Sequence, residues 1–354
     1  MSEKVLMKGN EAIAEAAIRC GCRHYFGYPI TPQTEIAAYM AKRMPKIGGT
    51  FLQAESEIAA INMVYGTAST GKRVMTSSSS PGIALKAEGI SYLAGADLPA
   101  LIVNVQRGGP GLGGIQPSQA DYFFATRGPG HGDFHVIVLA PASVQEMADL
   151  TKTAFELAEK YRMPAMLLAD GTMGQMMEPV VLPETSVDPA TIPVGKTWAT
   201  TGTEMKRKHN IINSLYLKPD ELEKTNVERY QRYERLAKEE TRWEEYMMDD
   251  ADICVVSTGI TARVSKNAIV ECRKRGIKVG MIRPITLYPF PNEPLAKAAA
   301  KVKSFLAVEL NMGQMSEDVS LAIKCTKPVA KCNRVGGMIP STDEVIAAIE
   351  KEAK

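Results

Sequence analysis

Two residues that follow short apolar runs carry groups able to bind a carboxylate. Thr31 lies in YPITPQT, after the run HYFG, and Arg107 follows LIVNVQ. A threonine oxygen can cap a helix while its hydroxyl hydrogen is donated to a ligand, and Pro32 suits the first helical position. A guanidinium can hold a carboxylate through two parallel hydrogen bonds. A plain helix cap at Thr31 and a surface ion pair at Arg107 remain open on these residues alone.

Glu57 is the acidic residue best placed for proton transfer. It lies with Glu55 at the expected start of a helix after FLQ, where the helix dipole favours a carboxylate. A catalytic interpretation requires Glu57 to face a cofactor, and its spacing does not separate that interpretation from simple helix stabilisation. The nearby SSSSPG, which ends at Gly82, follows an expected strand. Its hydroxyls could line a polar site or satisfy a buried turn.

The segment that begins at Arg107, RGGPGLGGIQPSQAD, is rich in residues that prevent regular structure. Six glycines or prolines lie between Gly108 and Gly114. A loop of this length inside a compact domain is usually a functional lid or a disordered segment.

The order of apolar runs and helical patterns predicts the elements that position these groups. From Gly9 to about Gly174 they alternate, which predicts an α/β fold with a largely parallel, doubly wound sheet and helices on both faces. Ligands bind such sheets at the carboxyl ends of the strands, where YPITPQT and SSSSPG fall. We expect a first domain at 1–178, a linker at 179–250 with a charged helix over 220–248, and a smaller α/β domain at 251–354.

Composition argues against several classes of function. The 354 residues carry 42 basic and 40 acidic side chains and a net charge of +2, which gives no electrostatic signature for nucleic acid or a membrane surface. The first residues do not resemble a secretory signal and no segment approaches a membrane span, so we expect a cytoplasmic protein. Six scattered cysteines without a C-x-x-C motif argue for reduced thiols, against an iron–sulfur cluster held by this chain and, with no metal-spaced cluster, against a metal site.

One motif comes close to a phosphate-binding loop. GTASTGKR, from Gly66 to Arg73, lacks the hydroxyl residue that ligates magnesium, because Arg73 takes that position. Its glycines also follow a helical pattern and precede a strand, the reverse of the order in a phosphate loop. Nucleotide hydrolysis is therefore a weak alternative.

Taken together, six motifs resemble those of the α subunits of 2-oxoacid:ferredoxin oxidoreductases. They are YPITPQT, QAESEIAA, SSSSPG, LPALIVNVQRGGPG, RPITLYPFP and VELNMGQM, and they extend nearly from end to end. The region TSSSSPGIALKAEGISYLAGADLPA is nearest the branched-chain type, which oxidises 3-methyl-2-oxobutanoate (2-ketoisovalerate). The 2-oxoglutarate type remains open. The resemblance implies that the first domain is the pyrimidine-side half of a thiamine diphosphate site and that the second resembles the C-terminal domain of transketolases.

The resemblance also implies an enzyme of several subunits. A partner would supply the diphosphate and Mg2+ half of the site, in agreement with the absence here of a G-D-G motif with a downstream Asn. Gamma-type and ferredoxin-like partner subunits would hold the iron–sulfur clusters. The implied reaction is the oxidative decarboxylation of a 2-oxoacid with coenzyme A to acyl-CoA, CO2 and reduced ferredoxin.

The matching positions include the residues singled out above. Glu57 aligns with the glutamate that hydrogen-bonds the aminopyrimidine ring, and Thr31 and Arg107 align with residues that engage the substrate carboxylate. The implied cofactor-binding set is Glu57, Tyr28, Pro29 and Ile30.

The substrate and the catalytic role stay open within this resemblance. A branched aliphatic tail requires an apolar pocket, whereas 2-oxoglutarate requires a second cation, for which Arg127 and Lys86 are candidates. The chain could also be a non-catalytic scaffold subunit or a transketolase-like transferase. The missing diphosphate motif disfavours a self-sufficient transferase.

Overall fold

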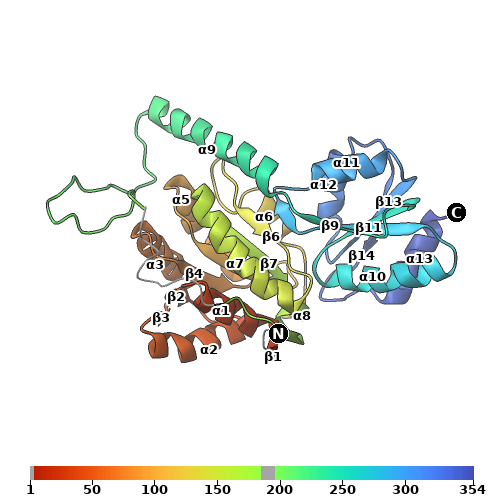
Figure 1. Cartoon of the computed structure of the whole chain (residues 1–354), viewed down its shortest axis with the longest axis horizontal. Coiled ribbons are helices and arrows are strands. Elements are labelled where there is room, and N and C mark those ends of the chain that lie inside the picture. The colour runs from red at the N-terminus through yellow and green to blue at the C-terminus, as the bar shows by residue number, and fades with distance from the viewer. Residues whose placement is uncertain (1–3, 185–195) are drawn as a thin grey trace.

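The strands of the first sheet are short, apolar and mostly buried on both faces, as expected for parallel strands covered by helices. The computed structural model describes residues 4–184 and 196–354, which form two α/β bodies (Figure 1). The first sheet has the strand order β12-β6-β7-β5-β4-β2-β3, with only β12 antiparallel to its neighbour. Its strands are β2 (His24–Gly27), β3 (Thr50–Gln53), β4 (Val74–Ser78), β5 (Leu101–Gln106), β6 (Ile137–Leu139), β7 (Ala165–Asp170) and β12 (Thr286–Tyr288).

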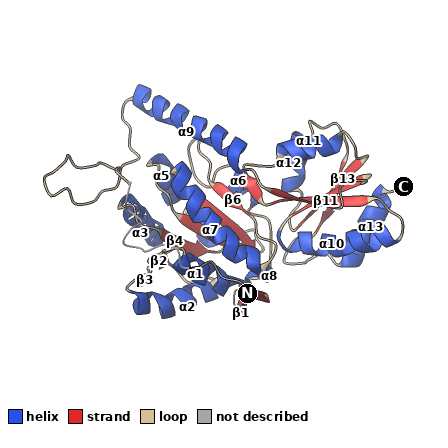
Figure 2. Ribbon diagram, in the orientation of Figure 1, coloured by secondary structure: helices blue, strands red, loops and turns tan. Residues whose placement is uncertain are grey.

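Helices cover both faces of this sheet (Figure 2). One face packs against α3 (Glu57–Ser69), α5 (Ala87–Gly95) and α6 (Tyr122–Thr126), and the other against α1 (Gly9–Arg19), α2 (Thr34–Arg43) and α7 (Val144–Tyr161). In α7 the buried residues recur at helical spacing, and the Ser143 hydroxyl caps the helix by accepting from Glu146 N at 3.0 Å. The predicted doubly wound α/β fold is confirmed.

Shorter elements complete the first body. Helix α4 (Ser80–Leu85) leads directly into α5, α8 (Gly171–Gln175) follows β7, and a short 3-10 turn, η1 (Met44–Ile47), follows α2. Strands β1 (Val5–Lys8) and β8 (Met177–Val180) pair antiparallel beside α1.

The charged helix is shorter than the sequence predicts. Helix α9 (Pro219–Glu240) ends eight residues before the predicted end at 248, and β9 (Trp243–Tyr246) follows it. Exposure alternates along WEEY, which is the period of a strand and not of a helix. Strand β9 pairs antiparallel with β11 and so belongs to the second sheet, although it lies inside the segment predicted as the linker. The boundaries at residues 178 and 250 remain predictions.

The second body is a five-stranded sheet in the order β14-β13-β10-β11-β9, with helices on both faces. Its remaining strands are β10 (Ile253–Ser257), β11 (Val279–Pro284), β13 (Ser304–Glu309) and β14 (Val329–Asn333). Its helices are α10 (Gly259–Lys274), α11 (Asn292–Ala299), α12 (Gln314–Ala322) and α13 (Thr342–Glu352). No helix within the described ranges is long and apolar enough to cross a membrane.

Buried polar contacts join the two bodies. Asp170, at the end of β7, accepts from Met173 N at 3.0 Å and from Ile260 N of the second body at 3.1 Å. Burial raises the pKa of Asp170. Gly259 has φ +58°, and a Cβ there would lie 2.9 Å from the Asp170 carboxylate. Glycine at 259 therefore allows this close approach of the two bodies.

Arg283, in β11, forms a buried ion-pair cluster between the bodies. It is 3% exposed, donates to Glu146 at 2.6 and 3.0 Å, and donates to Glu244 at 2.7 Å. Arg283→Met should lower the stability of the protein by about 2 kcal/mol. This is less than the roughly 3–5 kcal/mol for a fully buried pair, because both carboxylates stay partly exposed.

Thermal unfolding of the purified protein would measure this effect. Lys297→Met is the control, because its ion pair with Glu293 is 73% exposed on both sides and should contribute little. Equal midpoints for the two variants would contradict the prediction.

Candidate active site at the strand ends

The predicted site residues lie at the carboxyl ends of neighbouring strands of the first sheet. Thr31 follows β2, Glu57 follows β3 as the first residue of α3, and Arg107 follows β5. The segment that includes Ser80 follows β4, between the last two. Parallel pairing places these ends at one edge of the sheet, so residues 76 positions apart in sequence meet.

Arg107 and Thr31 are in direct contact. Arg107 is 9% exposed as a whole residue. Its guanidinium donates through Nη1 to the Thr31 carbonyl at 3.0 Å and through Nη2 to the Leu112 carbonyl at 3.0 Å. Its Nε is buried and has no hydrogen-bond partner among the described residues. Since a guanidinium has five donors, Arg107 retains donors for an anion. An unpartnered buried donor is costly unless a ligand satisfies it.

Thr31 does not cap a helix, and this expectation is wrong. Helix α2 begins at Thr34, its N-cap is Gln33 without a side-chain cap, and Thr31 and Pro32 lie in the preceding turn. The turn is held instead by the Pro32 carbonyl, which accepts from Asn10 Nδ2 at 2.8 Å and from Gln175 Nε2 at 3.3 Å. The Thr31 side chain is exposed as a result and is not committed to the helix.

The buried Gln33 side chain holds this turn on its inner side. We did not predict this role for Gln33 from the sequence. It is fully buried, and its Oε1 accepts from Ser77 Oγ at 2.6 Å, which is in turn 2.7 Å from the Tyr25 hydroxyl. The only signal for it is a polar residue at a position that the helical period assigns to the buried side.

The predicted cofactor-binding residues Tyr28, Pro29 and Ile30 lie in the loop between β2 and α2. Tyr28 is 37% exposed, and its carbonyl accepts from Gln33 Nε2 at 3.4 Å. Pro29 is exposed and Ile30 half-buried. This exposed strip lies beside Thr31, where a ligand or a second chain can reach it.

Glu57 lies under the SSSSPG segment and does not contact Thr31. It is 5% exposed, and Gly82 approaches it so closely that a Cβ would lie 2.6 Å from Glu57 Oε1 and 2.2 Å from Ser78 Oγ. The buried hydroxyls of Thr76, Ser78 and Ser79 have no partner among the described residues. A buried carboxylate beside the unpartnered Ser78 hydroxyl fits the proton partner of an aminopyrimidine ring, which the motif resemblance implies for Glu57.

If Glu57 binds the ring that the motif resemblance implies, Gly82→Ala should weaken thiamine diphosphate binding by roughly 10–100-fold, because the methyl group would displace the Glu57 carboxylate. Equilibrium titration of the cofactor into the cofactor-free complex would measure it. Gly66→Ala, in the same helix as Glu57, is the control, since a Cβ there meets nothing within 4 Å. Unchanged affinity in Gly82→Ala would show that cofactor binding does not depend on the position of the Glu57 carboxylate.

A half-buried carboxyl, Asp121, holds the segments that carry Arg107 and Ser80. Its Oδ2 accepts from Ser80 Oγ at 2.6 Å and from Asn104 Nδ2 at 2.8 Å, and Arg107 N donates to Ser80 Oγ at 3.0 Å. Burial raises the pKa of Asp121. This network fixes the backbone around Arg107, and no sequence motif indicates it.

A cavity of about 1000 Å³ opens beside Arg107. Its lining comes from both bodies, and Arg107 is the one cation among the described residues that form it. The apolar lining residues are Pro81, Ala84, Leu85, Pro110, Leu112, Ala120, Leu310, Met312 and Val335. The Asp121 carboxyl also lines the cavity, and it accepts hydrogen bonds from Ser80 and Asn104. With Arg107 and mainly aliphatic walls, the cavity can hold an anionic head group at Arg107 and an apolar tail.

The glycine-rich loop forms one wall of this cavity. It is closed at its base by a bridge between Arg107 and Pro117 and by Gly108 N, which donates to the Gln116 carbonyl at 2.9 Å. Residues 109–116 beyond the base are exposed. Near its end the loop is buried against the second body. There the Gln119 side chain accepts from Leu310 N at 3.0 Å and donates to the Thr258 carbonyl at 2.8 Å.

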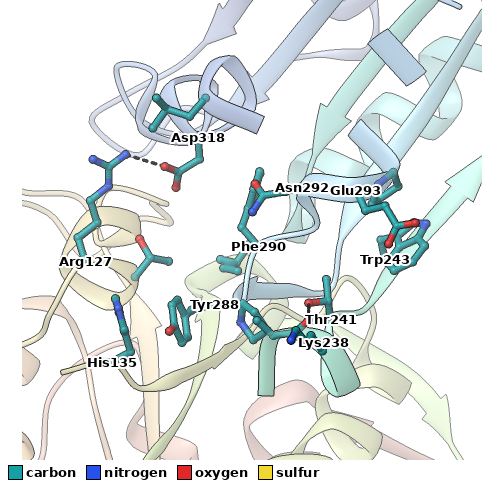
Figure 3. Close-up of a pocket in the computed structure, with 16 residues that line it drawn as sticks. Arg127, His135, Lys238, Thr241, Trp243, Tyr288, Phe290, Asn292, Glu293 and Asp318 are labelled. Carbon is teal, nitrogen blue, oxygen red and sulfur yellow. Dashed lines mark hydrogen bonds and ion pairs between the residues drawn. The ribbon is translucent and has the colours of Figure 1, made fainter. Parts of the chain in front are cut away.

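Arg127 lies in a different cleft, between α9, β12 and α12 (Figure 3). It pairs with Asp318 at 2.6 Å and lies over the Phe123 ring. His135 stacks on Tyr288 nearby, with ring centroids 4.0 Å apart. Arg127 is therefore not brought to Thr31 and Arg107. Within the described ranges no group of three or more His, Cys, Asp or Glu side chains could hold a metal ion.

The family models match both bodies of the chain. Residues 15–247 match the thiamine diphosphate-binding domain of pyruvate flavodoxin/ferredoxin oxidoreductases, and residues 251–345 match core domain II of pyruvate:ferredoxin oxidoreductases. The chain belongs to the 2-oxoacid:ferredoxin oxidoreductase family. The predicted family and the thiamine diphosphate fold are thereby confirmed.

Relatives and a solved structure agree with this assignment. The ketoisovalerate oxidoreductase subunit VorB of Methanothermobacter marburgensis is 49% identical and covers 98% of this chain, which spans 97% of it. The 2-oxoglutarate synthase subunit KorA of Methanocaldococcus jannaschii is 37% identical, with coverage of 97% and 98%. The structure of 2-oxoglutarate:ferredoxin oxidoreductase from Magnetococcus marinus, with 2-oxoglutarate, coenzyme A and succinyl-CoA bound, superposes with a TM-score of 0.87 at 28% identity. It covers all of this chain, which spans 66% of that one.

Proposed function

We propose that this chain, with partner subunits, oxidatively decarboxylates a branched-chain 2-oxoacid of the 3-methyl-2-oxobutanoate type. The products are the acyl-CoA, CO2 and reduced ferredoxin. The observation that carries the substrate is the cavity beside Arg107, which combines one cation with aliphatic walls. The relative whose name specifies ketoisovalerate is also more similar than the one named for 2-oxoglutarate, at 49% against 37% identity.

Each predicted residue has a task that fits its surroundings. Arg107 would hold the substrate carboxylate in this cavity through the donors that it does not spend on the Thr31 and Leu112 carbonyls. The Thr31 hydroxyl, which lines the neighbouring pocket, would assist from there. Glu57 would exchange a proton with the aminopyrimidine ring, with Tyr28, Pro29 and Ile30 beside it. Bound thiamine diphosphate supplies a nucleophilic carbon and a sink for the electrons that decarboxylation releases.

The glycine-rich loop would contribute by covering the substrate and not through a charged side chain. It forms a wall of the cavity and carries Leu112 and Ile115 at its exposed tip, 82% and 57% exposed. Closed over a substrate, it would exclude water from the reacting atoms.

Partner subunits would complete the site. The side chains of Leu85, Leu112, Met312 and Val335 line the cavity and are 48–82% exposed, an apolar surface that another subunit would cover. We assign the diphosphate and Mg2+ half of the site to that subunit, and the iron–sulfur clusters to gamma-type and ferredoxin-like subunits of a cytoplasmic complex. Activity would then require the assembled complex.

The same chemistry on 2-oxoglutarate is the second candidate, because relatives named for that substrate also span the chain. It would require a second cation near Arg107. Arg127 is paired with Asp318 in the other cleft, and Lys86 is buried against Glu57 and does not line the cavity. Both observations favour the branched substrate.

The test is to purify the complex through a tag on this chain and to assay coenzyme A-dependent reduction of a viologen dye with a panel of 2-oxoacids. The highest kcat/KM for 3-methyl-2-oxobutanoate would support the proposal. A lead by 2-oxoglutarate would keep the chemistry and overturn the substrate. Absence of activity in a complex with its cofactor and clusters intact would favour a non-catalytic scaffold role.

A further inference from the structure

Lys86, which separates α4 from α5, is buried without a counter-charge in contact. Its side chain has no exposure, and its ammonium makes one long hydrogen bond within the described residues, to the main-chain carbonyl of Glu57 at 3.5 Å. It forms no ion pair in the described ranges. A buried ammonium in this state lowers stability, so its presence calls for a functional reason.

The packing around Lys86 places its ammonium beside the main chain at the start of α3. Gly89 of α5 approaches α3 so closely that a Cβ would lie 2.4 Å from Ile61, which holds the two helices together at this point. Glu57, at the start of α3, is the carboxylate whose charge acts on Lys86. The adjacent Glu88 of α5 instead accepts from the Tyr92 hydroxyl at the surface.

We propose that Lys86 is a positioning residue that acts through Glu57. Its positive charge, buried in the same region, offsets the cost of burying the Glu57 carboxylate once a bound ring has removed the remaining water. This rests on the proposed role of Glu57 and assigns a new task to Lys86. The Ser78 hydroxyl supports it, because it is buried without a partner among the described residues and lies with Glu57 beside Gly82.

The physical reason is the low dielectric of the site. Glu57 is 5% exposed, and covering it would disfavour its negative charge further. A positive charge in the same dry region offsets this cost far better than one in water. Without it, the carboxylate would be buried beside the ring with no compensating charge, and catalysis would slow.

The test compares Lys86→Met, which removes the charge at nearly constant shape, with Lys86→Gln, which keeps a donor for the Glu57 carbonyl. Both variants of the whole complex should lose kcat by roughly 10–100-fold, with KM for the 2-oxoacid nearly unchanged, because Arg107 and Thr31 hold the substrate. Full activity in Lys86→Gln would overturn the proposal, since it would leave only a structural hydrogen bond.

Thermal unfolding of the cofactor-free complex gives a readout that does not need turnover. Burial lowers the pKa of Lys86 to about 8 from its ordinary value of 10.5, so the charge reduces stability fully below pH 8 and not at all above about pH 10.5. Lys86→Met should therefore raise the midpoint by roughly 3–6 °C at pH 7, and this gain should shrink as the pH rises toward 10. If Lys86 had only a structural role, we would expect Lys86→Met to lower the midpoint, to lower kcat and to raise KM together.

Titration of thiamine diphosphate completes the test. Binding to the unmodified complex should weaken above pH 8 as Lys86 loses its proton, and Lys86→Met should lack this dependence. In the Glu57→Gln background, Lys86→Met should change the affinity less than twofold, and a full effect there would overturn the coupling. An active unmodified enzyme with unaffected Lys86 variants would refute this inference alone, whereas an inactive unmodified complex would refute the proposed function.

Discussion

Glu57→Gln should lower kcat of the assembled enzyme by roughly 10²–10⁴-fold, which is the range that a positioned proton-transfer group contributes. Gln is similar in shape and can still hydrogen-bond the ring, but it has no proton affinity near neutral pH. Because the side chain is 5% exposed and lies under Gly82, water cannot replace it easily. The measurement is steady-state viologen reduction with 3-methyl-2-oxobutanoate and coenzyme A.

The matched control is Glu55→Gln, which makes the same chemical change two residues earlier, just before the N-cap Ser56. Glu55 is exposed, whereas Glu57 is buried, so a general effect of charge near the start of α3 would appear in both variants. We expect Glu55→Gln to stay within about twofold of the unmodified enzyme. Thiamine diphosphate and iron content should be measured in each preparation, and equal activity of both variants would remove Glu57 from the mechanism.

Arg107→Ala should lower kcat/KM for the 2-oxoacid by roughly 10²–10³-fold, mainly through KM. Truncating one partner of a buried, hydrogen-bonded charge pair costs about 2–5 kcal/mol, and each 1.4 kcal/mol corresponds to a factor of ten. Arg107 also holds the carbonyls of Thr31 and Leu112, so part of the loss would reflect a displaced turn and loop.

Chemical rescue separates these two contributions. Added guanidinium should restore part of the activity of Arg107→Ala if the missing group binds the carboxylate, and should not if only the loop has moved. Arg127→Ala is the control, since that side chain is 44% exposed and paired with Asp318 in the cleft of Figure 3. A loss in Arg127→Ala as large as in Arg107→Ala would contradict the assignment of the carboxylate to Arg107.

The motifs of the second body show how far a sequence pattern can be interpreted without a structure. RPITLYPFP and VELNMGQM help to identify the family, and neither carries a predicted catalytic residue. In the structure Arg283 of the first motif pairs with Glu146, and Asn311 of the second donates to the Gln119 carbonyl at 2.9 Å. The first motif connects the second body to α7, and the second motif connects it to the loop that begins at Arg107.

The helix start at Thr31 failed for a related reason. Threonine followed by proline satisfies every local requirement for a cap, but Pro32 is buried, and its carbonyl is held by Asn10 and Gln175. These partners lie 22 and 143 residues away in the sequence. No local pattern contains such contacts. The helix therefore begins later than predicted, with Gln33 at the N-cap position.

Local patterns were sufficient to predict the alternation of strands and helices, the parallel sheet, the family, and the candidates Thr31, Glu57 and Arg107. Periodicity and motifs are set by residues that are close together in the sequence, so they can be recognised without the structure. Folding was needed to establish that Arg107 holds Thr31, that Lys86 lies against Glu57 without an ion pair, and that Arg127 belongs to a separate cleft. These relations depend on burial and on contacts between strand ends far apart in the chain. The reason is that the neighbours brought together by folding determine which groups a charged side chain contacts and how strongly it interacts with them.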